Sequence, residues 1–274
     1  MKITLSCLIA LFLFMVGSPV RALEPFVLYE DFSVKILDET KWYGSETISP
    51  GVNIEDQVLQ ISGGKLHMLA RFYGNVSPPA GVSRGFYNLT FANPATITAI
   101  AATVQVKNIE ADGCPANPTP TVASASLVGS FFNTDTPDGT SLNDVLGLIY
   151  ISLASNSTDA PKILEVWGVI SQCTDSTCTT FTVLNSKQLG TIKVGAKTTL
   201  SMQWDQPNHQ FIFQFGKLAS VPLGYAVSDT SAPSVNFKHL RLRNYIANCA
   251  TGPRLQSFVE AYFDNVFVNQ SAAP

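Results

Sequence analysis

A two-residue alternation of apolar and polar side chains recurs along this chain of 274 residues, and no stretch shows a convincing 3.6-residue apolar period. In residues 209–215, for example, Phe211, Phe213 and Phe215 share one face, while two glutamines and an isoleucine take the other. Such alternation predicts β-strands that turn one face towards a core. The candidate strands are 26–31, 57–62, 65–73, 85–91, 96–108, 121–133, 144–154, 162–172, 179–185, 198–205, 209–215, 223–227, 237–246 and 257–268.

Short loops with turn-forming residues separate these strands, among them Ser-Gly-Gly at 62–64, Thr-Pro-Asp-Gly at 136–139 and Gln-Pro-Asn at 206–208. Many strands with no helices between them predict an all-β, two-sheet antiparallel sandwich. No internal repeat and no linker-like tract marks a boundary. Residues 23–274 are therefore expected to form a single β-sandwich domain.

The N-terminus has the three parts of a secretory signal peptide: a short basic start, an apolar run from Ile3 to Val16, and small or aliphatic residues before a cut after Ala22. The apolar run is shorter than the roughly 20 residues that span a membrane. A retained anchor is the alternative. We expect residues 1–22 to be a signal peptide and the mature protein to be extracellular or periplasmic, with no stable membrane insertion.

Cleavage after Ala22 would remove one cysteine and leave Cys114, Cys173, Cys178 and Cys249. An even number of cysteines in an oxidising compartment predicts two disulfides. Three pairings are possible, and the sequence alone does not choose among them. The close spacing of Cys173 and Cys178 suits a bridge across a tight hairpin, which would pair Cys114 with Cys249. A zinc site is the competing interpretation, but the usual C-x-x-C pairs are missing.

The charge balance excludes several classes of function. The mature chain would carry 15 basic and 20 acidic residues, and the basic residues form no cluster typical of nucleic-acid binding. No phosphate loop, dinucleotide fingerprint, G-x-S-x-G elbow or H-E-x-x-H motif is present. We expect no nucleic-acid partner and no cofactor other than a structural ion.

Four segments resemble one family. D-F-S followed by L-D-E-T-K-W (31–42), G-K-L-H-M (64–68), the pair L-S-M-Q-W-D and Q-F-I-F-Q-F-G (200–216), and A-Y-F-D-N-V-F-V (261–268) are similar to segments of concanavalin A-like, laminin-G-like jelly rolls. The resemblance implies a jelly-roll sandwich. This fold occurs in lectins, carbohydrate-binding modules, glycoside hydrolases, polysaccharide lyases and adhesion domains, so the function has to be argued from the residues.

The carboxylates argue against a hydrolase. Glucan-cleaving members of the family carry E-x-D-x-E or a close variant on one strand, but Asp144 stands alone in the corresponding region. The resemblance also implies a structural calcium ion held by Asp264 of the last strand with Glu30 and Asp31 near the first. An ordinary solvated face, or a carboxylate pair formed by Glu260 and Asp264, are the alternatives.

Two strand faces have the residue types that polysaccharide lyases use. These faces carry His67, Arg71 and Tyr73 on one strand and His239, Arg241, Arg243 and Tyr245 on another. If both lined one groove, that groove would suit an acidic glycan, although the lyases' own motifs are absent. The alternative is that both rows are polar outer faces.

Glu165 and Trp167 share one strand face and would form a sugar platform, with an aromatic plane under the ring and a carboxylate for its hydroxyls. The alternative places Trp167 in the core. Together these features predict a secreted, non-catalytic jelly-roll domain that binds a glycan or a surface partner. A polysaccharide-degrading enzyme, a lyase before a hydrolase, and a purely structural or adhesive exported protein are the other hypotheses.

Overall fold

The computed structural model describes residues 23–48, 53–76, 81–250 and 254–273. The expected signal segment, residues 1–22, lies outside the described residues. Among the described residues, no helix is both long enough and apolar enough to span a membrane.

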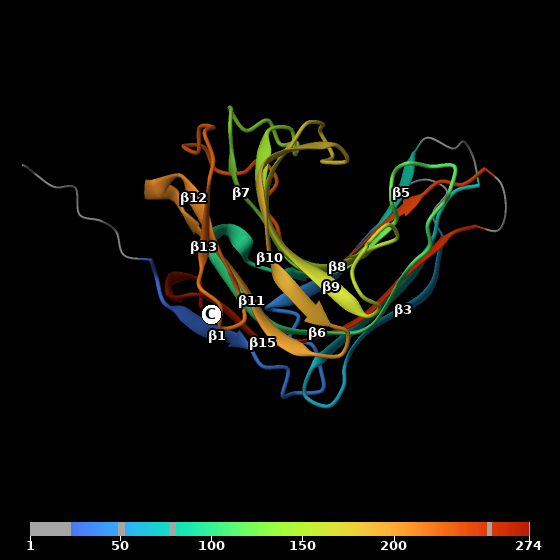
Figure 1. Cartoon of the computed structure of the whole chain (residues 1–274). Coiled ribbons are helices and arrows are strands. Elements are labelled where there is room, and N and C mark those ends of the chain that lie inside the picture. The colour runs from blue at the N-terminus through green and yellow to red at the C-terminus, as the bar shows by residue number, and fades with distance from the viewer. Residues whose placement is uncertain (1–22, 49–52, 77–80, 251–253, 274) are drawn as a thin grey trace, which may run out of the picture.

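The described residues form two antiparallel sheets that face each other (Figure 1). The eight-stranded sheet runs in the order β13 (Val221–Gly224), β12 (Gln210–Phe215), β11 (Lys197–Asp205), β6 (Ala99–Ala111), β15 (Gln256–Asn269), β4 (Leu66–Tyr73) and β3 (Asn53–Ile61), with β1 (Phe26–Glu30) also paired to β15. The seven-stranded sheet runs in the order β10 (Phe181–Lys193), β9 (Ile163–Cys173), β8 (Asp144–Ala154), β7 (Val122–Asn133), β14 (Lys238–Ala247), β5 (Val82–Phe91) and β2 (Trp42–Ile48). The predicted all-β antiparallel sandwich is confirmed.

Two strands differ most from the expectation. β2 was not predicted, because its sequence shows no clear alternation, and its place comes from pairing with β5. β10 continues to Lys193 rather than ending near residue 185, because its second half pairs with β9 along Ile163–Trp167. Long-range pairing therefore creates strand structure where the local pattern is weak.

The C-terminal strand changes face near its end. The alternation predicts that Val259, Ala261, Phe263 and Phe267 share the core face, but a bulge between Asp264 and Phe267 shifts the register. Asn265 sits in the bulge with a φ of 47°. Val266 and Val268 are therefore buried, whereas Phe267 is only half-buried, so its predicted place in the core was wrong.

The core is held by phenylalanine rings of the eight-stranded sheet that pack against glycines of the seven-stranded sheet. A Cβ atom added to these glycines would lie 2.3 to 2.7 Å from the nearest ring atom. The three pairs are Gly85 with Phe72, Gly147 with Phe211, and Gly168 with Phe213. Since real Cβ atoms do not approach so closely, each ring needs the space that a missing side chain leaves.

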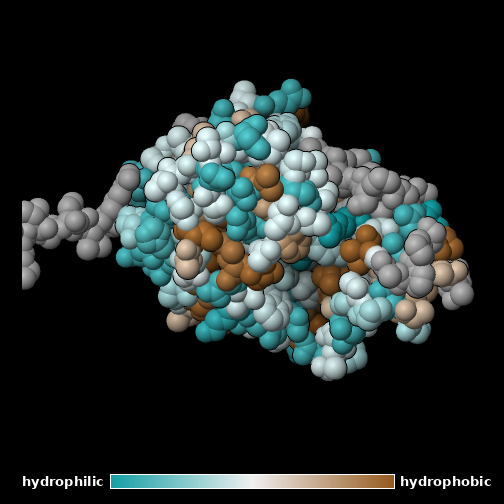
Figure 2. Space-filling view, turned by 90° about the horizontal axis from the view of Figure 1, so that it is seen from above, coloured by the Kyte–Doolittle hydropathy of each residue, from teal (hydrophilic) through white to brown (hydrophobic). Residues whose placement is uncertain are grey.

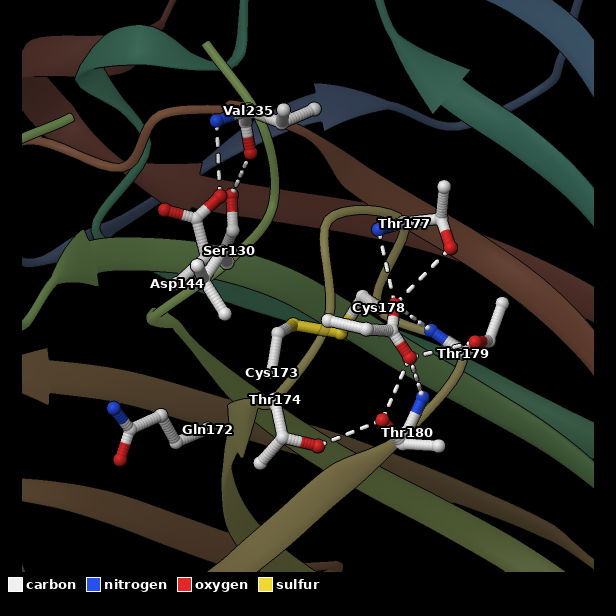
Figure 3. Close-up of a disulfide and its surroundings, with 12 residues drawn as sticks. Ser130, Asp144, Gln172, Cys173, Thr174, Thr177, Cys178, Thr179, Thr180 and Val235 are labelled. Atoms are coloured by element: carbon white, nitrogen blue, oxygen red, sulfur yellow. Dashed lines mark hydrogen bonds between the residues drawn. A yellow bond between two sulfur atoms is a disulfide. The ribbon is translucent and has the colours of Figure 1, made fainter. Parts of the chain in front are cut away.

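Two disulfides are present, between Cys114 and Cys249 with a Cα–Cα distance of 5.7 Å and between Cys173 and Cys178 with 4.8 Å. This is the one of the three possible pairings that the close spacing of Cys173 and Cys178 favours. The first bridge joins parts of the chain 135 residues apart. The second closes the hairpin between β9 and β10 (Figure 3).

The β9–β10 hairpin is also fixed by one carboxylate. Asp175 accepts hydrogen bonds from the backbone N–H and side-chain hydroxyl groups of Thr177, Thr179 and Thr180 (Figure 3). Burial raises the pKa of Asp175, but the hydrogen bonds from Thr179, Thr180 and Thr177 outweigh burial and hold that pKa well below its usual range. The disulfide and these hydrogen bonds together hold the turn at this edge of the seven-stranded sheet.

A lysine is buried on the core face of the same sheet. Lys238 on β14 is 1% exposed, and its Nζ donates to the carbonyl of Ser130 and lies 4.5 Å from the ring centroid of Phe131. Burial lowers the pKa of Lys238 to about 7, although the charge of Asp144 raises it in part. Stability should therefore depend on pH through this group.

Gly168→Ala is expected to lower the free energy of unfolding by about 1–3 kcal/mol, because the added methyl would overlap the ring of Phe213. Urea unfolding of the two proteins measures the difference. Gly44→Ala is the matched control, since a Cβ there would lie 4.0 Å from its nearest neighbour. Equal destabilisation by the two substitutions would contradict the role assigned to the glycine–phenylalanine contacts.

The free energy of unfolding is expected to rise as the pH is raised from about 7 towards about 10.5. In that window the unfolded chain still protonates Lys238, whereas the folded protein holds it neutral. Lys238→Met should remove this part of the pH dependence, and Lys187→Met, at an exposed position of β10, should leave it unchanged. Urea unfolding across the pH range is the measurement, and parallel curves for wild type and Lys238→Met would contradict the assignment.

Candidate functional site

The outward face of the seven-stranded sheet contains a cleft of about 330 Å³. The sheet is strongly curved, and this face is its concave side (Figure 1). The cleft is lined by Phe86, Val122, Leu146, Leu148, Tyr150, Trp167, Val169, Ser171, Cys178, Phe181, Val183, Ser186, Arg241, Arg243 and Tyr245. Seen from above, hydrophobic surface lies exposed between hydrophilic regions (Figure 2).

Strand register explains the floor of the cleft. Trp167 on β9 pairs with Tyr150 on β8, which pairs with Ser126 on β7, which in turn pairs with Arg241 on β14. These residues therefore form one row across four strands and point to the same face. Ser124, two residues before Ser126, points to this face as well. Because β7 contributes short side chains, space remains between the aromatic residues of β8 and β9 and the arginines of β14.

Arg243 lies across this space. Its Cζ is 4.5 Å from the ring centroid of Tyr150 and 5.0 Å from that of Tyr245, and its Nε donates to Ser124 Oγ at 3.2 Å. The side chain is nearly buried, with 7% exposure. Two aromatic faces and one hydroxyl thus hold the guanidinium in place.

Arg241 is held in a similar way. Its Nε donates to Asn88 Oδ1 at 2.7 Å, and its Cζ lies 4.8 Å from the ring centroid of Phe86. Burial lowers the pKa of Arg241 to about 10, and the nearby charge of Arg243 lowers it further, while Tyr245 opposes the shift. Neither arginine belongs to an ion pair within the described part of the chain.

One of the two residues of the predicted sugar platform lines the cleft. Trp167 is half-buried and lines the cleft, whereas Glu165 does not line it. The two side chains contact each other, because Trp167 Nε1 donates to Glu165 Oε2 at 2.9 Å. Glu165 therefore orients the indole ring and is itself occupied by that hydrogen bond.

The four residues predicted to share one face of β14 (His239, Arg241, Arg243 and Tyr245, here the β14 row) do not all line the cleft. Arg241, Arg243 and Tyr245 line the cleft, but His239 is not among the lining residues. His239 is 7% exposed, hydrogen-bonds Thr90 Oγ1 at 2.9 Å and stacks on Phe237. Burial lowers the pKa of His239 well below its usual value, and the charges of Arg241 and Lys238 lower it further.

The structure does not bring the β14 row and the β4 row (His67, Arg71 and Tyr73) into one groove. Leu66, Met68, Ala70 and Phe72 of β4 are buried in the core, so His67, Arg71 and Tyr73 point to the outward face of the eight-stranded sheet. The β14 row is on the outward face of the opposite sheet. Residues on opposite surfaces cannot act on one substrate, which removes the structural basis for the lyase hypothesis.

The β4 row is engaged in local contacts instead. His67 Nε2 lies 3.0 Å from Glu260 Oε1 and its ring stacks on Tyr262, while Arg71 Nε donates to Asp56 Oδ2 at 2.9 Å. Glu260 is therefore paired with a histidine rather than with a second carboxylate. These contacts describe a polar outer face.

The residues expected to hold calcium are each engaged in other contacts or lie near lysines. Glu30 Oε2 lies 3.5 Å from Lys41 Nζ, and Glu30 Oε1 accepts the backbone N–H groups of Asp31 and Phe32. Asp264 lines a small depression together with Lys65 and Lys197. Within the described residues no group of three potential metal-ligating side chains occurs. A lysine is paired with Glu30 and two lysines line the same depression as Asp264, and these positive charges disfavour a divalent cation there.

A polar network that the sequence did not indicate lies between β11, β12 and the segment after β13. Asp229, which is 3% exposed, accepts from Tyr225 Oη at 2.6 Å and lies 3.0 Å from His209 Nδ1, while Trp204 Nε1 donates to Tyr225 Oη at 2.7 Å. Burial and the hydrogen bond to Asp229 raise the pKa of Tyr225. The network fixes the segment after β13 to the hairpin that joins β11 to β12.

Sequence patterning missed the apolar part of the cleft for a physical reason. β8 reads as one apolar run, because its core residues alternate with Leu146, Leu148 and Tyr150, which point outward. Leu146, Leu148 and Val169 form a second hydrophobic cluster with Val128. A strand that is apolar on both faces gives no period-two signal, so the outward cluster could not be recognised.

No protein-family model matches the chain, and no curated protein matches it. Solved structures do show a similar strand arrangement. A glycoside hydrolase family 16 endo-glucanase from Bacteroides ovatus has 16% identity and a TM-score of 0.46, covering 87% of this chain and 98% of the other. The Bacillus licheniformis β-glucanase has 11% identity and a TM-score of 0.43, covering 91% and 99%.

The potassium-bound carbohydrate recognition domain of Emp46p has 10% identity and a TM-score of 0.39, covering 87% of this chain and 96% of that domain. These three proteins are concanavalin A-like jelly rolls, the superfamily that the sequence motifs resemble. At such identities and scores the similarity carries no argument about the activity of this chain.

Calcium is expected to leave the melting temperature unchanged, because lysines lie next to the carboxylates that would bind it. Thermal unfolding of residues 23–274 with a chelator and with millimolar calcium chloride measures this. Magnesium chloride at equal ionic strength is the control for screening. A melting temperature raised by calcium but not by magnesium would contradict this assessment of Glu30, Asp31 and Asp264.

Proposed function

We propose that this protein is a secreted, single-domain, non-catalytic jelly roll that binds a glycan in the cleft on the outward face of its seven-stranded sheet. The observation that carries the proposal is the row of Trp167, Tyr150 and Arg241 across the floor of that cleft. Half-buried aromatic rings offer flat apolar surfaces for the C–H faces of sugar rings. The guanidiniums offer several hydrogen-bond donors to ring substituents.

The absence of carboxylates in the cleft supports binding rather than hydrolysis. None of the cleft-lining residues in the described part of the chain is an aspartate or glutamate. Glycoside hydrolysis by the usual mechanisms requires two carboxyl groups that flank the scissile bond. Glu165, the nearest candidate from the sequence, accepts a hydrogen bond from the indole of Trp167 and is the one carboxylate on its face of β9.

Trp167→Ala is expected to weaken glycan binding at least about tenfold, because an aromatic anchor in a recessed site contributes 1–2 kcal/mol or more. A glycan array with residues 23–274 would identify ligands, and calorimetric titration would measure the affinities. Tyr73→Ala is the control, since Tyr73 lies on the outward face of the opposite sheet.

Loss of binding with Tyr73→Ala but not with Trp167→Ala would move the site to the eight-stranded sheet and contradict the proposal. If the wild-type protein bound neither neutral nor acidic glycans on the array, that result would also contradict the proposal and would favour an adhesive or structural role. Hydrolysis of a bound oligosaccharide would contradict the non-catalytic part.

A further inference from the structure

The cleft has two chemically different parts. One part is cationic and aromatic, with Arg241, Arg243, Tyr150 and Tyr245. The other is apolar, with Leu146, Leu148, Val169, Phe181 and Val183. Trp167, whose strand β9 also carries Val169, lines the same cleft. A ligand that fills the cleft has to satisfy both parts.

The cationic part lacks a counter-charge. Within the described residues, both guanidiniums donate hydrogen bonds through Nε only, to Asn88 and to Ser124, and neither takes part in an ion pair. A partly desolvated guanidinium without an anion is costly, and the neighbouring rings offset only part of that cost. The geometry of a guanidinium matches a carboxylate or a sulfate, which can accept two parallel hydrogen bonds.

The apolar part is more than a sugar ring requires. Phe181 and Val183 on β10 are 37% and 49% exposed, next to the outward cluster that contains Leu146, Leu148 and Val169. Apolar side chains gathered in a recess, rather than scattered, indicate a surface that a ligand covers. Sugar hydroxyls placed against these side chains would lose hydrogen bonds to water without replacement.

We propose that the ligand is an amphipathic anion, namely a saccharide unit that carries both an acidic group and an apolar substituent such as an acyl or aryl chain. This inference rests on the proposed glycan-binding function. The acidic group binds Arg241 and Arg243, the sugar ring lies on Trp167 and Tyr150, and the apolar substituent lies along Leu146, Leu148 and Val183.

Four probes used below their micelle-forming concentrations separate these contributions by calorimetric titration of residues 23–274. Octyl β-D-glucuronide has the charge, the sugar and the chain. Octyl β-D-glucoside lacks the charge, glucuronate lacks the chain, and decanoate lacks the sugar. Octyl glucuronide is expected to bind at least about tenfold more tightly than each of the other three.

Two variants test the two parts of the cleft. Arg243→Gln is expected to bring the affinity for octyl glucuronide down to that for octyl glucoside, and Leu148→Ser is expected to weaken both octyl probes and leave glucuronate unchanged. Arg71→Gln, on the outward face of the other sheet, is the matched control and should change none of the affinities. Thermal unfolding of each variant checks that it folds, and the wild-type probe series decides the question without them.

The outcomes separate this inference from the proposed function. Equal binding of octyl glucoside and octyl glucuronide would overturn the anionic ligand and leave glycan binding in place. Binding of decanoate as tight as that of octyl glucuronide would overturn glycan binding and leave an amphipathic anion as the ligand. Equal binding of glucuronate and octyl glucuronide would overturn the apolar substituent, and no binding by any probe would overturn both proposals.

Discussion

The packing of phenylalanine rings against glycines is the contact on which the arrangement of the two sheets depends. Phe72, Phe211 and Phe213 of the eight-stranded sheet each occupy space that a glycine of the seven-stranded sheet leaves open. The rings bring the sheets together at three places spread over β5, β8 and β9. Interiors packed to crystal-like density allow little adjustment at such contacts. The core face of the seven-stranded sheet is thus fixed, and with it the positions of the residues that point outward from the same strands.

The outward face follows from this arrangement by strand geometry. Each core residue on β8 and β9 has neighbours that point the other way, so Gly147 lies between Leu146 and Leu148, and Gly168 lies between Trp167 and Val169. The glycines that leave space for the phenylalanine rings therefore alternate along each strand with residues that line the cleft. The β9–β10 hairpin is held by its disulfide (Figure 3) and by the hydrogen bonds to Asp175, and it contributes Cys178 and Phe181 to the lining of the cleft.

The electrostatics of the seven-stranded sheet are unusual on both of its faces. Lys238 is buried on the core face with a pKa lowered to about 7, and Arg241 and Arg243 lie on the outward face without a carboxylate partner among the described residues. Cations without partners in partly apolar surroundings lower the stability of the folded state unless something compensates for them. For Lys238, the carbonyl of Ser130, the amide oxygen of Asn236 and the ring of Phe131 offset this cost. For the two arginines, a bound anion would offset it.

The fold class and most strands could be predicted from the sequence, because period-two alternation is a local property that each strand with one buried face carries. The sequence also pointed to Trp167, Arg241, Arg243 and Tyr245 as candidates, since an aromatic plane suits a sugar ring and Arg and Tyr on one strand face are residue types that polysaccharide lyases use. That these four residues line one cleft, and that His67, Arg71 and Tyr73 lie on the opposite surface, became clear from the three-dimensional arrangement of the strands. This placement depends on which sheet each strand joins, and pairing between strands far apart in the chain leaves no local signal. The apolar half of the cleft was hidden for the related reason that β8 is apolar on both faces.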